Sequence, residues 1–120
     1  MRKELEDRLV ALSVNIEKLC RGMDKSYMSD HLMTQIIRSS TSAALNYGEA
    51  QAAESKNDFI HKISIILKEL RETQICLKLL AGSTKENQAE LLENCQEECG
   101  QLVAIFHKTV MTAKSNRQKN

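Results

Sequence analysis

The sequence predicts an all-α protein folded as an up-down-up-down antiparallel four-helix bundle. The chain has no proline and only four glycines among 120 residues, and 28% of its residues are charged, so little interrupts a long helix. Apolar residues recur every three or four positions, which buries one face of a helix. A chain of this length forms one domain, because a single core then buries roughly two-thirds of the surface of the unfolded chain.

The first helix is predicted over residues 2–21. Its apolar residues are spaced alternately by four and three, as in the seam of a helix bundle, and comprise Leu5, Leu9, Leu12, Ile16, Leu19 and Met23. Gly22 and the polar residues through Ser26 follow. Gly22 is expected to end the helix in the left-handed conformation that glycine readily adopts.

The second helix is predicted to begin at Ser29 or Asp30, because either side chain can accept hydrogen bonds from free backbone N–H groups. Its apolar stripe comprises Leu32, Met33, Ile36 and Ile37. The helix then enters residues 38–55, RSSTSAALNYGEAQAAES, where Leu45 and Tyr47 are the only large apolar residues. The short side chains of this segment are expected to let a neighbouring helix approach closely.

The third helix is predicted from about Asn57 to Gly82, after an imperfect capping box formed by Ser55 and Asp58. It carries the largest set of apolar residues in the chain: Phe59, Ile60, Ile63, Ile66, Leu67, Leu70, Leu77 and Leu80. This set predicts a helix of about six turns with a deeply buried face.

The fourth helix is predicted to begin at a full capping box, in which Ser83 and Glu86 satisfy each other's backbone donors. Its inner face comprises Leu91, Leu92, Cys95, Cys99, Leu102, Val103, Phe106 and Val110. The acidic residues of its first half suit the positive end of the helix dipole. The bundle is predicted over residues 1–113, and residues 114–120, KSNRQKN, are expected to form a basic disordered tail.

A polar stripe follows the second helix. With about 100° between successive helical residues, one side of the helix carries Arg38, Ser42, Asn46 and Glu49. One interpretation is a solvated helix face, where these residue types usually lie. The other is a half-buried network in which Arg38 donates to a carboxylate of the third helix, Glu69 or Glu72, while the serine and asparagine of the stripe satisfy nearby partners.

The motif of the second and third helices resembles that of a bacterial four-helix-bundle family. This family includes the proteins encoded in intervening sequences of large-subunit rRNA and the accessory variability determinant of diversity-generating retroelements. The resemblance covers about residues 5–112. Its most specific positions are Arg38, Ser42, Asn46, Glu49, Glu69, Leu70, Glu72 and Thr73.

The resemblance implies a homopentameric barrel without catalytic activity, in which the motif is a structural signature that fixes the packing of the bundle and of the subunits. It also implies nucleic acid and a reverse transcriptase as partners, since the accessory members bind both. The chain departs from the family in lacking a proline near Ala43 or Ala44 and in having Ala50 where a glycine is usual. A straighter second helix is therefore expected.

Two classes of function follow. The first is a non-catalytic oligomeric scaffold or protein-interaction module. The second is an accessory protein that binds RNA or DNA through a basic face of the oligomer. The net charge of +1 excludes a globally basic surface, so nucleic-acid binding would depend on a local patch. The candidate contacts are Lys62, Lys68, Arg71, Lys78, Lys114, Arg117 and Lys119.

Other chemistry has weaker support in the sequence. Cys95 and Cys99 lie one helical turn apart and could share a metal ion, but a structural zinc site needs two further ligands, and core packing is preferred for all four cysteines. His61 with Asp58 or Ser64 is a candidate for acid/base chemistry, as is the carboxylate pair of the third helix. No glycine-rich loop or nucleophile motif accompanies either set, so the sequence predicts no enzyme, no metal and no cofactor.

The N-terminal stretch, MRKELEDRLVALSV, bears on localisation. It mixes acidic and basic residues and contains only a short apolar run, which is too short and too charged for a signal peptide or a membrane span. A cytoplasmic protein without membrane contact is expected.

Overall fold

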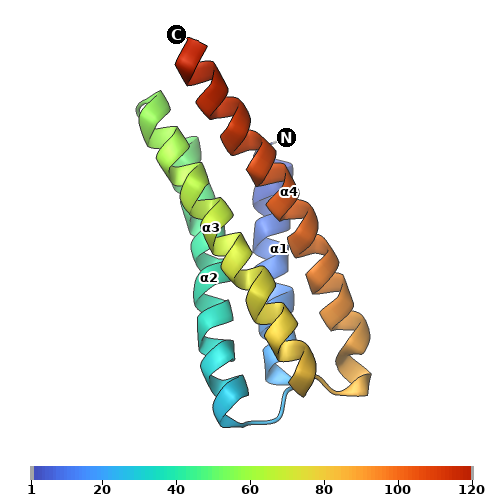
Figure 1. Cartoon of the computed structure of the whole chain (residues 1–120). Helices are drawn as coiled ribbons and strands as arrows, with labels where there is room; N and C mark the ends of the chain where they lie inside the picture. The colour runs from blue at the N-terminus through green and yellow to red at the C-terminus, as the bar shows by residue number, and fades with distance from the viewer. Residues whose placement is uncertain (1, 120) are drawn as a thin grey trace.

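The structure is a computed structural model that describes residues 2–119, except for the side chain of Lys119. It contains four α-helices and, over these residues, no β-strand: α1 (Arg2–Arg21), α2 (Tyr27–Gln51), α3 (Lys56–Leu80) and α4 (Ala89–Lys119). The helices run alternately down and up, and each packs against two neighbours (Figure 1). The α1–α2 and α3–α4 connections lie at one end of an elongated molecule of 51 × 23 × 21 Å. The predicted all-α fold with four helices is confirmed.

The core lies on the helix faces that the apolar periodicity predicts. All four helices contribute side chains that are less than 2% exposed, among them Leu9, Ile16, Leu19, Ile36, Ile63, Ile66, Leu70, Leu77, Leu80, Leu102 and Phe106. Ile37 differs from the prediction, because it is 37% exposed and lies a further 100° or so around α2 from the fully buried Ile36. The small residues Ser39, Ser40 and Ala43 are buried and continue the inner face of α2.

The connection between α1 and α2 corrects two predictions. No glycine in the described residues has a positive φ, so Gly22 does not end α1 in the left-handed conformation. The N-cap of α2 is Ser26, whose hydroxyl oxygen accepts a hydrogen bond from the backbone N–H of Ser29 at 3.0 Å. Ser29 is fully buried instead, and its hydroxyl group donates to the carbonyl oxygen of Asp24 at 2.8 Å.

Gly22 provides space for the side chain of Gln88. A Cβ atom at position 22 would lie 2.1 Å from the Nε2 atom of Gln88, well inside van der Waals contact. The same Nε2 atom donates to the carbonyl oxygen of Leu19 at 2.8 Å, while Oε1 has no partner among the described residues. The Gln88 side chain therefore satisfies a backbone carbonyl at the C-terminal end of α1 and closes this end of the bundle.

The connection between α3 and α4 also differs from the prediction. Helix α3 ends at Leu80, and two 3₁₀ turns, Ala81–Ser83 and Glu86–Gln88, precede α4. The predicted capping box of Ser83 and Glu86 is therefore wrong. The chain instead turns so that the side chain of Gln88, which is 8% exposed, is buried in the bundle. The Nζ atom of Lys85 lies 2.9 Å from a carboxylate oxygen of Asp24.

Two further helix ends have simpler explanations. Ser55 caps α3 by accepting a hydrogen bond from the backbone N–H of Asp58 at 3.0 Å, as the sequence predicts. Helix α4 continues to Lys119, so residues 114–119 are helical and not the disordered tail expected from their composition. Neither glycine nor proline interrupts this stretch, and its basic residues suit the negative end of the helix dipole.

None of the helices described is both long and apolar enough to span a lipid bilayer.

Candidate functional site

The most polar contact between two helices lies between α2 and α3. One terminal nitrogen of Arg38 donates to Glu69 at 2.9 Å, and the other donates to Glu72. The side chain of Glu69 is 8% exposed, whereas that of Arg38 is 50% exposed. Both hydrogen bonds raise the pKa of the Arg38 guanidinium group, and the bond to Glu72 has the larger effect. Arg38 therefore neutralises a buried carboxylate at the edge of the α2–α3 contact.

A chain of hydroxyl groups lies beneath this ion pair. The hydroxyl oxygens of Ser39 and Thr73 are 2.7 Å apart, and both residues are fully buried. Thr73 also donates to the backbone carbonyl oxygen of Glu69 at 2.9 Å. The small side chain of Ser39 permits this contact. The short residues of α2 therefore let the two helices approach each other closely here.

The rest of the predicted motif forms two separate contacts. Asn46 donates to the backbone carbonyl oxygen of Ser42 at 2.9 Å, one turn earlier on α2. Glu49 accepts a hydrogen bond from Lys62 of α3 at 2.9 Å. Both contacts are outside the Arg38 cluster, and Leu45 in the middle of the stripe is 68% exposed. The stripe therefore lies along the flank of the bundle, partly in solvent, with only its Arg38 end in contact with a buried acid.

Two polar contacts on the other flanks have no signal in the sequence. Arg8 of α1 donates to both carboxylate oxygens of Glu98 on α4, at 2.9 and 2.7 Å. The hydroxyl groups of Ser13 and Ser40 meet at 3.2 Å between α1 and α2. The residues in these pairs lie 90 and 27 positions apart, so no local periodicity could have paired them. With the α2–α3 cluster and the hydrogen bond from Arg117 of α4 to Asn57 of α3, each of the four contacts between neighbouring helices includes a polar side-chain contact.

A partly apolar surface lies on α1 and α2. Val10 and Val14 of α1 are 48% and 49% exposed, and Ile37 and Leu45 of α2 are 37% and 68% exposed. The two helices are in contact, and the valines flank Ser13, which meets α2 at Ser40. Together these four side chains define what we call the α1–α2 face.

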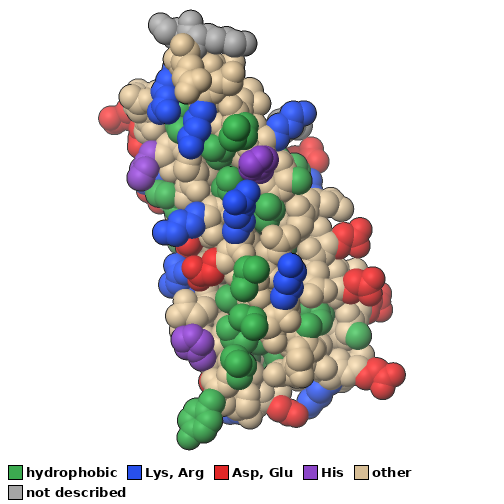
Figure 2. All heavy atoms as spheres, in the orientation of Figure 1, with side chains coloured by type: hydrophobic (Ala, Val, Ile, Leu, Met, Phe, Trp, Pro, Cys, Tyr) green, Lys and Arg blue, Asp and Glu red, His purple; other side chains and the backbone are tan. Residues whose placement is uncertain are grey.

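The predicted basic contacts divide into two groups. Lys62 is paired with Glu49 and is only 24% exposed, so it is not a free cation. The exposed group comprises Lys68, Arg71, Lys78, Lys114 and Arg117, while the side chain of Lys119 lies outside the described part of the structure. Figure 2 shows lysine and arginine side chains along the length of this side of the molecule, separated by hydrophobic ones, with the acidic side chains mainly at its right edge.

The candidate chemical groups do not assemble into a catalytic or metal site. Ser64 donates to the backbone carbonyl oxygen of Ile60 at 2.7 Å, and His61 is exposed. The carboxylates of Glu69 and Glu72 are both engaged by Arg38. Within residues 2–119, no group of three or more histidine, cysteine or acidic side chains lies close enough to hold a metal ion.

All four cysteines are free and buried, which confirms the core-packing prediction. Burial raises the pKa of Cys20 and Cys95 to about 11 and that of Cys99 to about 12. The Cys99 thiol also donates to the carbonyl oxygen of Leu70 at 3.4 Å. These thiols are therefore poor metal ligands and poor nucleophiles, since both roles require the thiolate.

The raised thiol pKa values predict a loss of stability at alkaline pH. An unfolded thiol ionises near pH 8.5, whereas these folded thiols stay protonated to about pH 11 or 12. Each thiol contributes its full stabilisation below the unfolded pKa. As the pH rises through this window, the free energy of unfolding falls by about 1 kcal/mol per pH unit for each thiol. Urea unfolding at pH 8, 9 and 10 measures this slope, and Cys99→Ala is expected to reduce it. An unchanged slope would contradict the assignment.

Comparisons with known proteins agree with this geometry. Residues 5–107 match a protein family described as 23S rRNA-intervening sequence protein. The chain is also similar to a solved protein of unknown function from the S23 ribosomal protein family of Bacteroides thetaiotaomicron, with 30% sequence identity and a TM-score of 0.73. That match covers 88% of this chain and 97% of the other. No curated protein gives a significant match.

Proposed function

The chain belongs to the 23S rRNA-intervening sequence protein family, and from this premise we propose that it is a non-catalytic scaffold that works as a homo-oligomer. The proposed assembly is a homopentameric barrel, the state implied by the family resemblance. Subunits would meet through the α1–α2 face, and a larger enzyme such as a reverse transcriptase would bind to the assembled ring. The observation that carries this proposal is the exposed apolar surface of α1 and α2.

The composition of the α1–α2 face supports a contact between subunits. Its four large apolar side chains are between 37% and 68% exposed. A Cβ atom added at Gly48 would meet nothing within 4 Å, so there is room for another helix to approach the backbone. Interfaces within stable oligomers are more apolar than the remaining surface, which fits the exposed apolar side chains of this face.

The mass in solution tests the proposal. At micromolar concentration we expect sedimentation velocity or light scattering to give about five times the chain mass of 13.6 kDa. The double variant Val14→Glu/Leu45→Glu is expected to lower that mass without changing the helix content, because charges at an apolar interface are costly to bury. Leu79→Glu, at another exposed apolar position on α3, is the matched control and should leave the mass unchanged. A monomeric wild-type protein would contradict the proposal.

A second candidate function is nucleic-acid binding through exposed cations of α3 and α4. Its support is that Lys68, Lys78 and Lys114 lie within 4 Å of no carboxylate among the described side chains, so their charges are available to phosphate groups. An oligomer would repeat this modest patch and add to its field.

Salt dependence separates the two candidates. If each chain contacts three phosphates of a duplex, raising the salt concentration from 50 to 200 mM should weaken binding about 40-fold. A protein partner held by apolar contacts should respond little. Lys68→Glu with Lys78→Glu should abolish binding to a fluorescent RNA or DNA duplex, whereas Lys18→Glu, at an exposed position of α1, should not. No detectable binding at low salt would exclude this candidate.

A further inference from the structure

The end of the bundle that holds both termini is open. Helix α4 diverges there from α2 and α3 (Figure 1), and a cavity of about 590 Å³ lies between them. Its apolar lining comprises Leu5, Tyr47, Ala50, Ala53, Phe59, Ile60, Ile63, Phe106 and Ala113. The rings of Tyr47 and Phe106 meet edge to face with centroids 5.7 Å apart. The volume lies in the range of small-molecule sites, roughly 300–1,000 Å³.

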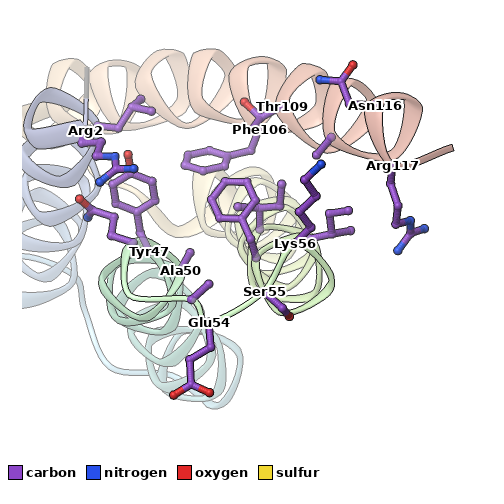
Figure 3. A pocket seen from close by; sticks show the side chains of 17 residues that line it. Arg2, Tyr47, Ala50, Glu54, Ser55, Lys56, Phe106, Thr109, Asn116 and Arg117 are labelled. Atoms are coloured by element: carbon purple, nitrogen blue, oxygen red, sulfur yellow. The ribbon is translucent and has the colours of Figure 1, made fainter. Parts of the chain in front are cut away.

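Three cationic side chains belong to the lining. Arg2, Lys56 and Arg117 all line the cavity, and none of them lies within 4 Å of a carboxylate of the described residues. Figure 3 shows Lys56 reaching from the start of α3 toward α4, and Glu54, the single acidic residue of the lining, pointing away from the cavity. The cavity therefore carries an excess of uncompensated positive charge.

Two further features favour an anion at this end. Arg117 donates to the side-chain oxygen of Asn57 at 3.2 Å, which holds its guanidinium group across the gap between α4 and α3. Lys56 is the first residue of the 25-residue helix α3, so the positive end of the α3 dipole also lies at this end of the bundle. A carboxylate placed here would pair with cationic side chains that have no carboxylate partner among the described residues.

The hydroxyl group of Tyr47 is the third feature. Tyr47 is only 7% exposed and lines the cavity. Its hydroxyl group makes no side-chain hydrogen bond within residues 2–119 and is not one of the fully buried unpaired polar atoms there, so it is open to solvent and to a ligand. A phenol is protonated at neutral pH, and it can therefore donate a hydrogen bond.

We propose that this cavity binds a small amphipathic anion, a carboxylate with an apolar tail such as a medium-chain fatty acid. The tail packs against Phe59 and Phe106, and the carboxylate lies among the basic side chains of the rim. A neutral ligand would leave these charges uncompensated, and a cationic one would be repelled. The inference goes beyond the scaffold function and does not depend on it, because every lining residue comes from one chain.

Titration with decanoate, followed by calorimetry or by amide chemical shifts, tests the inference. We expect saturable binding of one decanoate per chain below its micelle concentration. Acetate, which lacks the tail, and decyltrimethylammonium, which has the opposite charge, should each bind at least about tenfold more weakly, since a factor of ten corresponds to one lost favourable contact. Absence of saturable decanoate binding, or equal binding of the cationic amphiphile, would overturn the inference.

Variants locate the binding in the cavity. Lys56→Gln/Arg117→Gln should weaken decanoate binding at least about tenfold, while Lys114→Gln, which removes an exposed charge of α4 outside the lining, should not. Ala113→Phe should fill the cavity and abolish binding, with Ala104→Phe on the exposed side of α4 as its control. The charge variants do not touch the core, so they remain informative if Ala113→Phe fails to fold. Equal losses in variants and controls would show that decanoate binds elsewhere.

Discussion

Replacing Arg38 with alanine is expected to lower the melting temperature by about 5–10 °C. The reason is the carboxylate that remains. Glu69 is nearly buried, with a side chain 8% exposed, and Arg38 is its cationic partner, at 2.9 Å. Removing one member of a buried ion pair leaves a charge without compensation, which costs more than the pair itself contributes. Thermal unfolding followed by circular dichroism measures the effect.

Two further variants test the explanation. Arg117→Ala removes an arginine from the exposed side of α4, where it donates a hydrogen bond to the amide side chain of Asn57. This variant should change the melting temperature by no more than about 2 °C. Arg38→Ala/Glu69→Gln removes the orphaned charge and should recover part of the loss. If Arg38→Ala and Arg117→Ala melt at the same temperature, the α2–α3 ion pair does not hold the bundle together.

The second large effect is expected for Phe106→Ala, which should reduce the free energy of unfolding by about 3–5 kcal/mol. Phe106 is 1% exposed and contacts Tyr47 edge to face, so the variant loses both apolar burial and an aromatic pair. The space left by the ring joins the cavity that Phe106 already lines. Urea unfolding monitored by far-ultraviolet circular dichroism gives the difference in free energy.

The chain contains one other phenylalanine, which provides a matched control. Phe59 lines the same cavity but is only partly buried, so Phe59→Ala should cost less than half as much as Phe106→Ala. Phe106→Leu should also be milder, because it keeps most of the apolar volume. Equal costs for the two alanine variants would show that the Phe106 side of the cavity wall is no better packed than the Phe59 side.

The helices could be predicted from the sequence because periodicity is a local property. The spacing of Leu9, Leu12 and Ile16 identifies the buried face of α1 regardless of what packs on it. Helix ends depend on distant residues instead. The Ser83–Glu86 pattern is a valid local signal for a helix start. The path of the chain there is instead set by the hydrogen bond between Gln88 and Leu19, which lies 69 positions earlier. Ser26 and Ser29 are equally good caps in sequence, and the burial of Ser29 decides between them.

The candidate site was predictable to the same degree. Arg38 and its two acidic partners could be expected to meet, because the helical spacing puts each on a flank facing the other helix. The contact between Ser39 and Thr73 could not be predicted from the sequence, because serine in a small-residue segment gives no sign of which neighbour its hydroxyl group meets. The cavity near Phe106 depends on the angle at which α4 leaves the bundle, and that angle is set by the packing of the whole molecule.

The contact between Gly22 and Gln88 constrains how relatives of this protein can diverge. Any side chain at position 22 would occupy the space of the Gln88 amide, so a substitution there would displace this amide from its hydrogen bond with Leu19 unless position 88 changed as well. The two positions should therefore covary among homologues, although neither belongs to the motif of the second and third helices. Gly22, which resembles a simple helix terminator, therefore forms a close steric contact between the first and third quarters of the chain.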